Sequence, residues 1–553
     1  MGRAPLNKPA ALLRAPPFPW SAGIRAPANP APDFDPADSD RLFEAVRIAQ
    51  VGGAFWDAPC APERLAETVF RPRSKAEIPD LQASFGIADV LDCPDDCDPW
   101  SILPHARRLV AHGDDEWIAI AIVLGIAVQV LSPGNYGAPS DDDATLKAKT
   151  LAALARPMPD PFSDGWLTPS QAIALLAEWR RVIDGNRGSG GQAIVAACGM
   201  SWWKRAEIRR FLWVPGTRLR ITNSGTSALT HAQRHGGAVA VWPSRISPRL
   251  IARAQEKGVA LVRVEDGFVR SAGLGSNLVP PSSVVVDRRG IHFDPSAPSD
   301  LETVLATTEF APALLERARQ LRESIVAAGI SKYARSSGAR GKASESPKRA
   351  RRVVLVPGQV EDDMSVLAGG GGMTSNLELL KRTRAIEPEA EIWWRPHPDV
   401  DAGHRNGVVA DEDALQYANR IVREGSMADL LDEVDALHVL TSLSGFEALL
   451  RGREVTCHGT PFFAGWGLTR DLGTVPGRRG RQLTLDELVA GVLLLYPRYL
   501  DPVTGLPCPP ELLIRRMAEG TMPNRQGWIE PLRRLQGRIV SRFQTRKAKA
   551  VHP

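Results

Sequence analysis

The stretch AVAVWPSRISPRLIARAQEKGVALVRVED, residues 238–266, decides the class of fold. Its two ends, 238–242 and 259–265, are continuous apolar runs of the kind that form strands buried on both faces. The segment between them, which contains RLIARAQEKG, has the pattern of an amphipathic helix. A strand, a helix and a second strand in this order predict parallel pairing within a doubly wound α/β sheet.

A second set of apolar strands follows later in the chain. It comprises VVLVPGQ (353–359), AEIWWRPHP (390–398) and ALHVLTS (436–442), with helical patterns between them. A polar, low-complexity stretch before residue 352 separates the two sets and indicates a domain boundary. We therefore predict two Rossmann-like domains, residues 192–330 and residues 352–505.

Three further regions flank these domains. Residues 1–38 carry nine prolines and few core-forming residues, which predicts a disordered tail. Residues 40–186 repeat, at low identity, the element order of the later chain. Because Glu447 of the later copy falls opposite Ile120, we expect a degenerate, partial α/β domain that is not catalytic. Residues 506–553 are predicted to form a helical basic tail.

The composition limits the class of protein. The 553-residue chain is 43% apolar and 24% charged, and its formal net charge of +5 is too small to indicate a nucleic-acid partner. The six scattered cysteines do not complete a zinc site, and we expect reduced thiols in a cytoplasmic protein. No signal-peptide pattern is seen, and the longest apolar run, Trp117–Leu131, is too short to span a bilayer. We expect this run to be a buried helix leading into a strand.

Two acidic motifs follow predicted strands. VEDGFVRSAGLGS (264–276) places Glu265 and Asp266 at a strand end, where α/β sheets bind ligands. VPGQVEDDMSVLAGGGG (356–372) places three neighbouring carboxylates, the last of them Asp363, beside a glycine-rich loop suited to anions. Clustered carboxylates beside such a loop favour acid–base chemistry. Each motif is also compatible with an acidic surface turn.

Polar residues of the second domain indicate a phosphate site. His397 lies between two prolines in RPHPDVDAGHRNG (395–407), which suits a histidine that donates to a phosphate, or equally a rigid loop with a satisfied histidine. In TSLSGFEALLRG, Ser442 and Ser444 form a plausible phosphate cradle and Glu447 an acceptor for ribose hydroxyls. The same spacing also fits a capping box. The aromatic loop PFFAGWGLT is suited to walling a sugar or base pocket.

Together these motifs indicate a nucleotide-sugar enzyme with a cleft between two Rossmann-like domains. Residues 238–505 moreover resemble the capsule polysaccharide biosynthesis proteins of the KpsC type, the retaining β-Kdo transferases. The resemblance runs through VEDGFVRSAGLGSNLVPPSSVVVDRRGIHFD, GISKYA, VLVPGQVEDD, RPHPDVDAGHRNG, TSLSGFEALLRGREVTCHGTPFFAGWGLT and LTLDELVAGVLLLYPRYLDP.

This resemblance implies an α/β, GT-B-like pair of Rossmann-like domains, CMP-β-Kdo as donor and retention of configuration. It implies a short β-Kdo oligosaccharide built on a phosphatidylglycerol-type or Kdo-primed glycolipid acceptor. Asp363 corresponds to the nucleophile, and Glu265, Asp266 and His397 are the other catalytic candidates. The donor-binding positions implied are Gln359, Pro398, Ser442, Ser444, Gly445 and Glu447, and those of the acceptor or sugar pocket are Arg270, Ser271, Lys332 and Trp466. We expect no cofactor and no metal.

The front of the chain departs from the family pattern. Residues 40–186 have neither an EDGF loop nor a QVEDD-like loop, so a product with two linkages is in doubt. Two alternative functions stay open, another CMP-sugar transferase such as a sialyltransferase, and a non-catalytic capsule-assembly scaffold.

The end of the chain predicts a location. Leu532, Leu535, Ile539 and Phe543 recur at helical spacing among basic residues, as in an interfacial helix on anionic lipid, although a solvated basic tail fits as well. We expect peripheral binding to the inner face of the bacterial inner membrane, with other capsule biosynthesis and export proteins as further partners.

Overall fold

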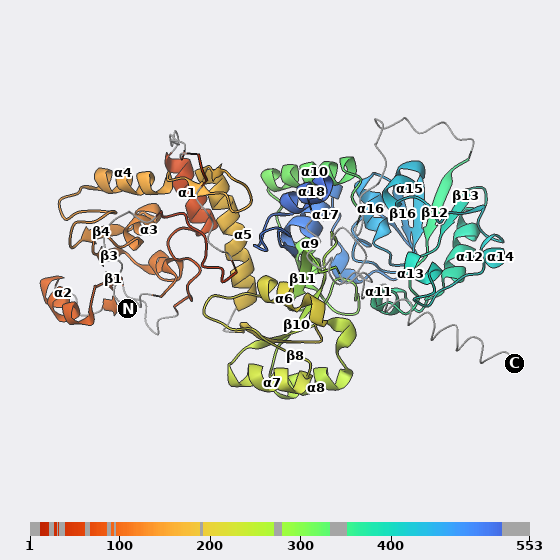
Figure 1. The fold of residues 1–553 in the computed structure, drawn as a ribbon, viewed down its shortest axis with the longest axis horizontal. Coiled ribbons are helices and arrows are strands. Elements are labelled where there is room, and N and C mark those ends of the chain that lie inside the picture. Colours follow the sequence, from red (N-terminus) through yellow and green to blue (C-terminus); the bar gives the residue numbers. More distant parts are fainter. Residues whose placement is uncertain are drawn as a thin grey trace. The chain divides into compact units, whose positions relative to one another are not determined.

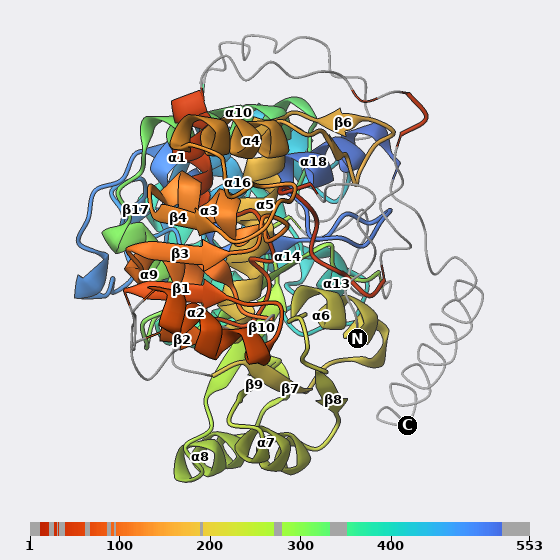
Figure 2. The ribbon, with the colours of Figure 1, turned by 90° about the vertical axis from the view of Figure 1, so that its left-hand side faces the viewer.

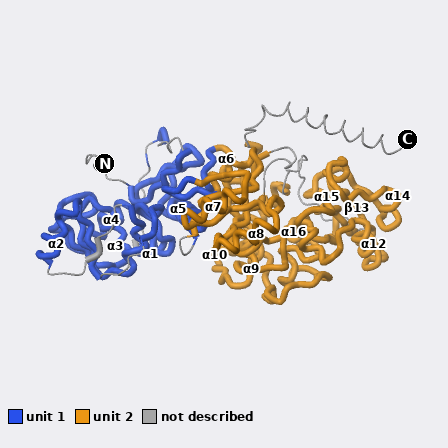
Figure 3. Tube along the Cα trace, turned by 90° about the horizontal axis from the view of Figure 1, so that it is seen from below, with its two compact units in different colours: residues 1–191, 212–218, 504–508 blue, residues 192–211, 219–503, 509–553 orange. Residues whose placement is uncertain are grey.

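The computed structural model describes residues 11–20, 27–29, 31, 39–60, 67–85, 90–92, 96–188, 192–269, 279–331 and 351–521. The chain divides into two compact units (Figure 3). Unit 1 consists of residues 1–191, 212–218 and 504–508, and unit 2 of residues 192–211, 219–503 and 509–553. Within the described parts of both units, no helix is both long enough and apolar enough to cross a bilayer.

Unit 1 is built around a small parallel sheet with the strand order β2-β1-β3-β4, whose strands follow one another in Figure 2. Its strands are β1 (Thr68–Arg71), β2 (Val90–Asp92), β3 (Arg108–Ala111) and β4 (Ala127–Val130), with a separate pair β5 (Met158–Pro159) and β6 (Trp166–Leu167). Its helices are α1 (Ser39–Ala49), α2 (Ile78–Phe85), α3 (Trp117–Leu124), α4 (Asp143–Leu154) and α5 (Pro169–Arg187), with short 3₁₀ turns at η1 (Lys75–Glu77), η2 (Pro99–Ser101) and η3 (Leu103–His105).

The apolar run from Trp117 forms the predicted buried helix and strand. Nearly all of α3 is buried, and Gly125, with φ of +74°, ends the helix so that the chain turns into β4.

One prediction for this region is wrong. Residues 11–20 are not a disordered tail, because Leu12, Leu13 and Phe18 are buried in the core of unit 1. Proline-rich sequence does not prevent such packing when apolar side chains lie between the prolines, since proline is compatible with extended backbone. The sulfur atoms of Cys60 and Cys97 lie next to each other, whereas Cys198, Cys457 and Cys508 are free thiols.

Unit 2 contains two lobes, each with a six-stranded sheet. The first sheet has the order β18-β11-β10-β9-β7-β8, and its strands are β7 (Ile194–Cys198), β8 (Arg220–Thr222), β9 (Ala238–Val241), β10 (Leu261–Asp266), β11 (Ser283–Asp287) and β18 (Pro497–Tyr499). The predicted pair β9 and β10 is parallel, as expected. The helical elements of this part of the chain are η5 (Trp202–Lys204), α6 (Arg205–Phe211), α7 (Gly225–Arg234), η6 (Pro243–Arg245), α8 (Pro248–Glu256), α9 (Asp300–Thr307) and α10 (Pro312–Ala327). Helices α7 and α8 lie side by side (Figures 1 and 2).

The second lobe has an entirely parallel sheet of order β14-β13-β12-β15-β16-β17. Its strands are β12 (Val353–Pro357), β13 (Glu391–Arg395), β14 (Arg420–Ile421), β15 (Ala436–Val439), β16 (Glu454–Cys457) and β17 (Arg470–Asp471). Its helices are α11 (Met364–Gly369), α12 (Asn376–Ile386), α13 (Pro398–Asp401), α14 (Asp411–Ala414), α15 (Met427–Glu433) and α16 (Ser444–Leu450), with a 3₁₀ turn η8 (Gly477–Arg479).

The chain then returns to the first lobe, so the prediction that residues 352–505 form one domain is wrong at its end. Helix α17 (Leu485–Val489) and the π-helix η9 (Ala490–Leu495) lead into β18, which pairs antiparallel with β11. Tyr496 fixes this return, because its buried hydroxyl donates to Asp287 Oδ2 at 2.8 Å. Helix α18 (Pro510–Glu519) also has a buried apolar face, so the basic tail does not begin at residue 506.

The sheet of unit 1 repeats the topology of the second lobe. The order β2-β1-β3-β4 matches β13-β12-β15-β16, with the strands in the same chain order and all parallel. This agrees with the repeat inferred from the sequence, in which β3, α3 and β4 correspond to β15, α16 and β16.

Candidate functional site

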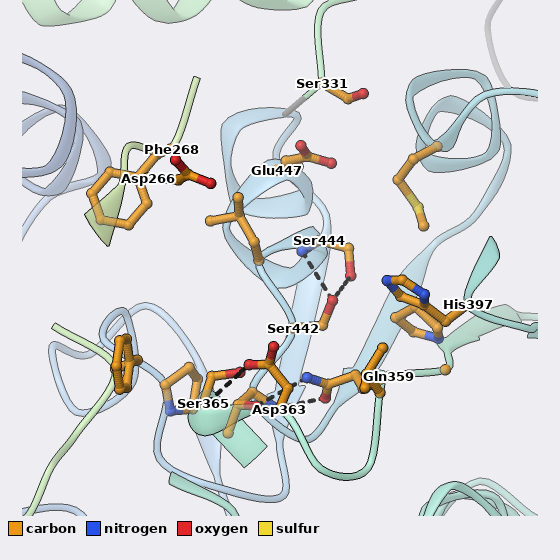
Figure 4. A pocket seen from close by; sticks show the side chains of 18 of the residues that line it. Asp266, Phe268, Ser331, Gln359, Asp363, Ser365, His397, Ser442, Ser444 and Glu447 are labelled. Atoms are coloured by element: carbon orange, nitrogen blue, oxygen red, sulfur yellow. Dashed lines mark hydrogen bonds between the residues drawn. The ribbon is translucent and has the colours of Figure 1, made fainter. Parts of the chain in front are cut away.

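A cleft of about 780 Å³ in unit 2 is lined by residues from both lobes. Most of the predicted site residues meet there, namely Glu265, Asp266, Gln359, Asp363, His397, Pro398, Ser442, Ser444 and Glu447. Figure 4 shows the side chains of Asp266, Asp363 and Glu447 around the same space. They reach it from the end of β10, the loop after β12 and helix α16. The arrangement follows from the parallel sheets, whose carboxyl ends carry these loops.

The first-lobe carboxylates lie on a rigid strand end. Glu265 and Asp266 are the last residues of β10, and both are in register with residues of β11. The Asp266 carboxylate accepts a hydrogen bond from Lys204 Nζ at 2.9 Å. The sequence analysis missed Lys204, because it lies 62 residues from its partner in the chain.

Of the three carboxylates after β12, only Asp363 lines the cleft. It is the N-cap of α11, and its Oδ1 accepts from the backbone N–H and the hydroxyl of Ser365 at 3.0 and 2.7 Å. Glu361 instead accepts from the backbone of Asn376, and Asp362 is paired with Arg405 at the surface. Of the three neighbouring carboxylates, one therefore borders the cleft, and each of the three has a different partner.

The side chain of Gln359 connects two loops of the cleft by hydrogen bonds. Its Nε2 donates to Thr441 Oγ1 at 3.0 Å and its Oε1 accepts from Thr441 N at 2.9 Å. Its backbone N–H and C=O are both bonded to the side chain of Asn376. Most of its hydrogen-bonding capacity is thus used within the protein, so it positions the loops that follow β12 and β15.

His397 is oriented by a helix start. It is the N-cap of α13, and its Nδ1 accepts from the backbone N–H of Asp399 at 3.2 Å, while Pro398 occupies the first turn. An Nδ1 that accepts leaves the ring proton on Nε2 in the neutral form. The histidine therefore combines the two interpretations left open by the sequence, since it is locally satisfied by one nitrogen and also lines the cleft.

The segment Ser442–Glu447 borders the cleft at the start of α16. The Ser442 and Ser444 hydroxyls are 2.7 Å apart. The alternative of a capping box is wrong, because the N-cap residue is Leu443, whose side chain makes no capping bond, and the backbone N–H of Ser444 donates to the Ser442 hydroxyl at 3.3 Å. Gly445 is not among the residues that line the cleft, and a Cβ there would lie 2.6 Å from Phe463 Cζ, so this glycine allows close packing.

Trp466 is not a pocket residue either. Its side chain is fully buried, and its Nε1 donates to the backbone oxygen of Phe462 at 2.9 Å. It supports Phe462, which does line the cleft. The aromatic loop thus reaches the cleft through Phe462 and not, as predicted, through Trp466. Arg270, Ser271 and Lys332 lie outside the described residues.

An aromatic wall completes the cleft and was largely missed by the sequence analysis. It consists of Trp242, Phe268, His292, Phe293 and Phe462. Phe268 packs at 4.6 Å from Phe462 and at 4.9 Å from His292, measured between ring centroids. Such faces suit the apolar faces of sugar rings. Only their convergence in the fold reveals them, because the five residues come from four separate segments.

Arg395 also lines the cleft. Its guanidinium donates to the carbonyl oxygens of Val422, Glu424 and Gly425, and it lines the cleft together with Gly425 and Ser426. Burial lowers the pKa of Arg395 from its ordinary value, but an arginine stays cationic in proteins. The cleft therefore contains a fixed positive charge as well as its carboxylates. Among the described residues, no group of three His, Cys, Asp or Glu side chains is arranged to hold a metal ion.

Two Rossmann-like lobes with polar strand ends meeting in one cleft define a GT-B-like fold. Residues 237–499 match the family model described as capsule polysaccharide biosynthesis protein. The chain is 41% identical over 333 residues to the capsule polysaccharide modification protein LipA of Neisseria meningitidis, covering 60% of this chain and 46% of LipA. It is 45% identical over 249 residues to the lipopolysaccharide-processing protein LpsZ of Rhizobium meliloti, covering 44% of this chain and 56% of LpsZ. The chain thus spans about half the length of these curated relatives.

Two solved structures of Thermosulfurimonas dismutans KpsC are also similar. One is described as a beta Kdo 2,7 transferase, with 34% identity, a TM-score of 0.48 and coverage of 59% of this chain and 99% of that one. The other is described as a beta Kdo 2,4 transferase, with 32% identity, a TM-score of 0.49 and coverage of 59% and 98%. Since this chain spans nearly all of both at these identities, it belongs to the capsule polysaccharide biosynthesis protein family, as its motifs predicted.

Proposed function

We propose that this protein is a retaining β-Kdo glycosyltransferase that takes Kdo from CMP-Kdo and adds it to the glycolipid linker of a capsular polysaccharide. The observation that carries the proposal is the single cleft that gathers Asp363, the Glu265–Asp266 pair and His397 from both lobes. Membership of the capsule family supports a role in capsular polysaccharide biosynthesis. The description of the two KpsC structures as beta Kdo transferases supports Kdo as the transferred sugar.

The second lobe would hold the CMP portion. The hydroxyls of Ser442 and Ser444 and the Nε2–H of His397 are donors at the cleft, and they suit the phosphate oxygens of CMP. Glu447, in the first turn of α16, is suited to accept from the ribose hydroxyls. Charge that develops on the leaving phosphate would be stabilised by these fixed donors, which need little rearrangement during the reaction.

Asp363 would act as the nucleophile. In the first step its carboxylate oxygen bonds to the anomeric carbon of Kdo, while the bond from that carbon to the CMP phosphate oxygen breaks and CMP leaves with the electron pair. In the second step an acceptor hydroxyl displaces the Asp363 carboxylate and gives its proton to a carboxylate of β10. Two inversions give net retention. The bonds from Ser365 hold Asp363 in one orientation for this attack.

Asp363→Asn tests the nucleophile. Asparagine keeps an oxygen that can accept from Ser365, so the fold and the affinity for CMP should change less than about twofold, whereas transfer should fall by roughly three orders of magnitude or more. Asp362→Asn is the matched control, because Asp362 is paired with surface Arg405 and does not line the cleft. Transfer would be measured with CMP-Kdo and a Kdo-primed glycolipid, and the anomeric configuration by NMR. Full activity of Asp363→Asn would contradict the mechanism.

The choice of donor is tested by comparing two CMP-sugars. We expect CMP-Kdo to be used in preference to CMP-sialic acid, and turnover to be unchanged by a chelator.

The location is tested with liposomes. We also propose that residues 530–553, which lie outside the described residues, bind the anionic inner face of the membrane. Flotation with anionic liposomes should then require that segment, and equal flotation without it would contradict this location.

A further inference from the structure

Lys204 is a buried lysine directly behind the acidic end of β10. Its exposed fraction is 7%, and its Nζ donates to Asp266 Oδ1 at 2.9 Å. Asp266 and Trp242 line the cleft, whereas Lys204 does not. Lysines are almost never buried unless they are paired, so the carboxylate of Asp266 is a defining part of this environment.

The ammonium group is also seated against two aromatic rings. Its Nζ lies 3.5 Å from the ring centroid of Trp242 and 5.0 Å from that of Trp203. Cation–π attraction at this range holds the charge in place. The lysine is thereby fixed on three sides, and the carboxylate that it contacts is fixed with it.

This ion pair is not needed to secure the strand. Asp266 is in register with Val284 of β11, and the next residue, Gly267, donates its N–H to Ser283 O at 3.0 Å. The backbone on both sides of Asp266 is therefore held by the sheet. The bond from Lys204 instead orients the Asp266 carboxylate, which points into the cleft (Figure 4). The positive charge of Lys204 also favours the ionised form of that carboxylate.

We propose that Lys204 is a positioning residue of the transfer step, which holds the Asp266 carboxylate ionised and aimed at the acceptor hydroxyl. This rests on the function proposed above. In that step the hydroxyl oxygen bonds to the anomeric carbon, the bond to Asp363 breaks with its electron pair returning to Asp363, and the hydroxyl proton passes to Asp266. Glu265, the other carboxylate of β10, accepts instead from the backbone N–H of Asp266. The geometry therefore assigns acceptor activation to Asp266.

The two half-reactions separate this role from a structural one. CMP-Kdo without acceptor loads Asp363, which intact-mass spectrometry follows as a Kdo adduct, and a Kdo-primed glycolipid then discharges it. Lys204→Met should form the adduct at close to the wild-type rate with an unchanged KM for CMP-Kdo, while discharge slows about 100-fold. Lys204→Arg, which keeps the charge, should restore most of the discharge rate.

A double-mutant cycle completes the test. If Lys204 acts through Asp266, adding Lys204→Met to Asp266→Asn should slow discharge no further than Asp266→Asn alone. Lys204→Met alone leaves the charge of Asp266 without its partner, which could prevent folding. The double variant removes both charges, so it should fold even if Lys204→Met does not. Normal discharge by Lys204→Met, equal losses in both half-reactions, or additive losses in the cycle would each overturn the inference alone. A wild-type protein that neither forms the adduct nor transfers Kdo would overturn the proposed function as well.

Discussion

At the scale of single residues, three side chains at the cleft are each oriented by capping the start of a helix. Asp363, His397 and Ser426 are the N-caps of α11, α13 and α15, and each accepts a backbone N–H from the first turn of its own helix. A side chain that caps a helix has its rotamer fixed by a local bond. The cleft therefore has preorganised polar groups although it is formed largely by loops.

Gly445 tests how tightly the start of α16 must pack. An alanine Cβ at this position would lie 2.6 Å from Phe463 Cζ, and Phe463 is fully buried. Gly445→Ala should therefore destabilise unit 2 by about 1–3 kcal/mol and weaken CMP binding, because Ser444 would shift. Thermal unfolding and calorimetry measure the two effects. Gly477→Ala is the control, since its Cβ meets nothing within 4 Å, and equal behaviour of both variants would contradict this account.

Residue identities at the cleft were predictable where polar groups lie at the end of an apolar strand or in the loop after it. Asp266, the last residue of β10, and Asp363, in the loop after β12, were found for this reason, since strand ends can be read from the local pattern. Lys204 was not, because its role depends on a contact with a residue 62 positions away. Trp466 was assigned wrongly, because an aromatic loop does not indicate which of its rings faces outward.

At the scale of elements, β15 and β16 carry a buried histidine pair. His438 Nδ1 and the Nε2 of His458 are 3.0 Å apart, and both side chains are buried. Burial, with the neighbouring His458 as the next cause, lowers the pKa of His438 to about 3, and burial lowers that of His458 to about 4. In the unfolded chain both would bind protons near pH 6.5.

This pair predicts the acid sensitivity of the second lobe. Between pH 6.5 and pH 4 the unfolded state binds more protons than the folded state, so the stability present above pH 6.5 is lost as the pH falls. The loss should be on the order of 2 kcal/mol per histidine between pH 7 and pH 5. Hydrogen–deuterium exchange of β15 and β16 amides measures it. His458→Gln should reduce the pH dependence, whereas exposed His404→Gln should not, and an unchanged slope in His458→Gln would contradict the assignment.

The elements of both sheets were largely predictable, but their final connection was not. The strands β9, β12, β13 and β15 fall within the predicted apolar runs, and β10 extends one residue beyond its run, to Asp266. The apolar pattern of residues 485–500 fits either sheet equally well. Only the pairing of β18 with β11 and the bond from Tyr496 to Asp287 place this segment in the first lobe.

At the scale of the whole molecule, unit 1 keeps the topology of the second lobe, but its strand ends are occupied by its own side chains. His112, after β3, contacts Ser132 Oγ through Nδ1 at 3.0 Å and Glu77 Oε2 through Nε2 at 3.1 Å. Arg73, after β1, donates its backbone N–H to Glu77 as well. This network lies where the second lobe carries its cleft-lining loops, which supports a structural role for unit 1.

His112→Ala tests whether unit 1 takes part in catalysis. Removing the imidazole breaks two hydrogen bonds, so the stability of unit 1 should fall by roughly 1–3 kcal/mol. The transfer rate with CMP-Kdo and a Kdo-primed acceptor should stay within about twofold of the wild type. A large loss of transfer in a variant whose unit 1 remains folded by hydrogen exchange would assign this unit a catalytic part.

Unit 1 is also assembled from distant stretches of the chain, and this predicts the effect of removing residues 1–191. Leu506 is only 2% exposed within the core of unit 1, and Trp213 packs against the same core. Trp179 Nε1 donates to Pro507 O at 2.7 Å, and Asn186 Nδ2 donates to Trp213 O at 3.0 Å. Truncation would leave both apolar side chains in solvent without these partners, and exposed apolar patches promote association.

We therefore expect a chain beginning at residue 192 to self-associate and to melt at a lower temperature than the full chain, as measured by light scattering and thermal unfolding. Trp213→Ser together with Leu506→Ser should restore a monodisperse truncated chain, because these changes remove the apolar surface that the deletion uncovers. Transfer activity in this rescued form would then show that unit 2 alone carries the chemistry. A truncated chain that is monomeric and equally stable without the two serines would mean that the segments 212–218 and 504–508 do not depend on the core of unit 1.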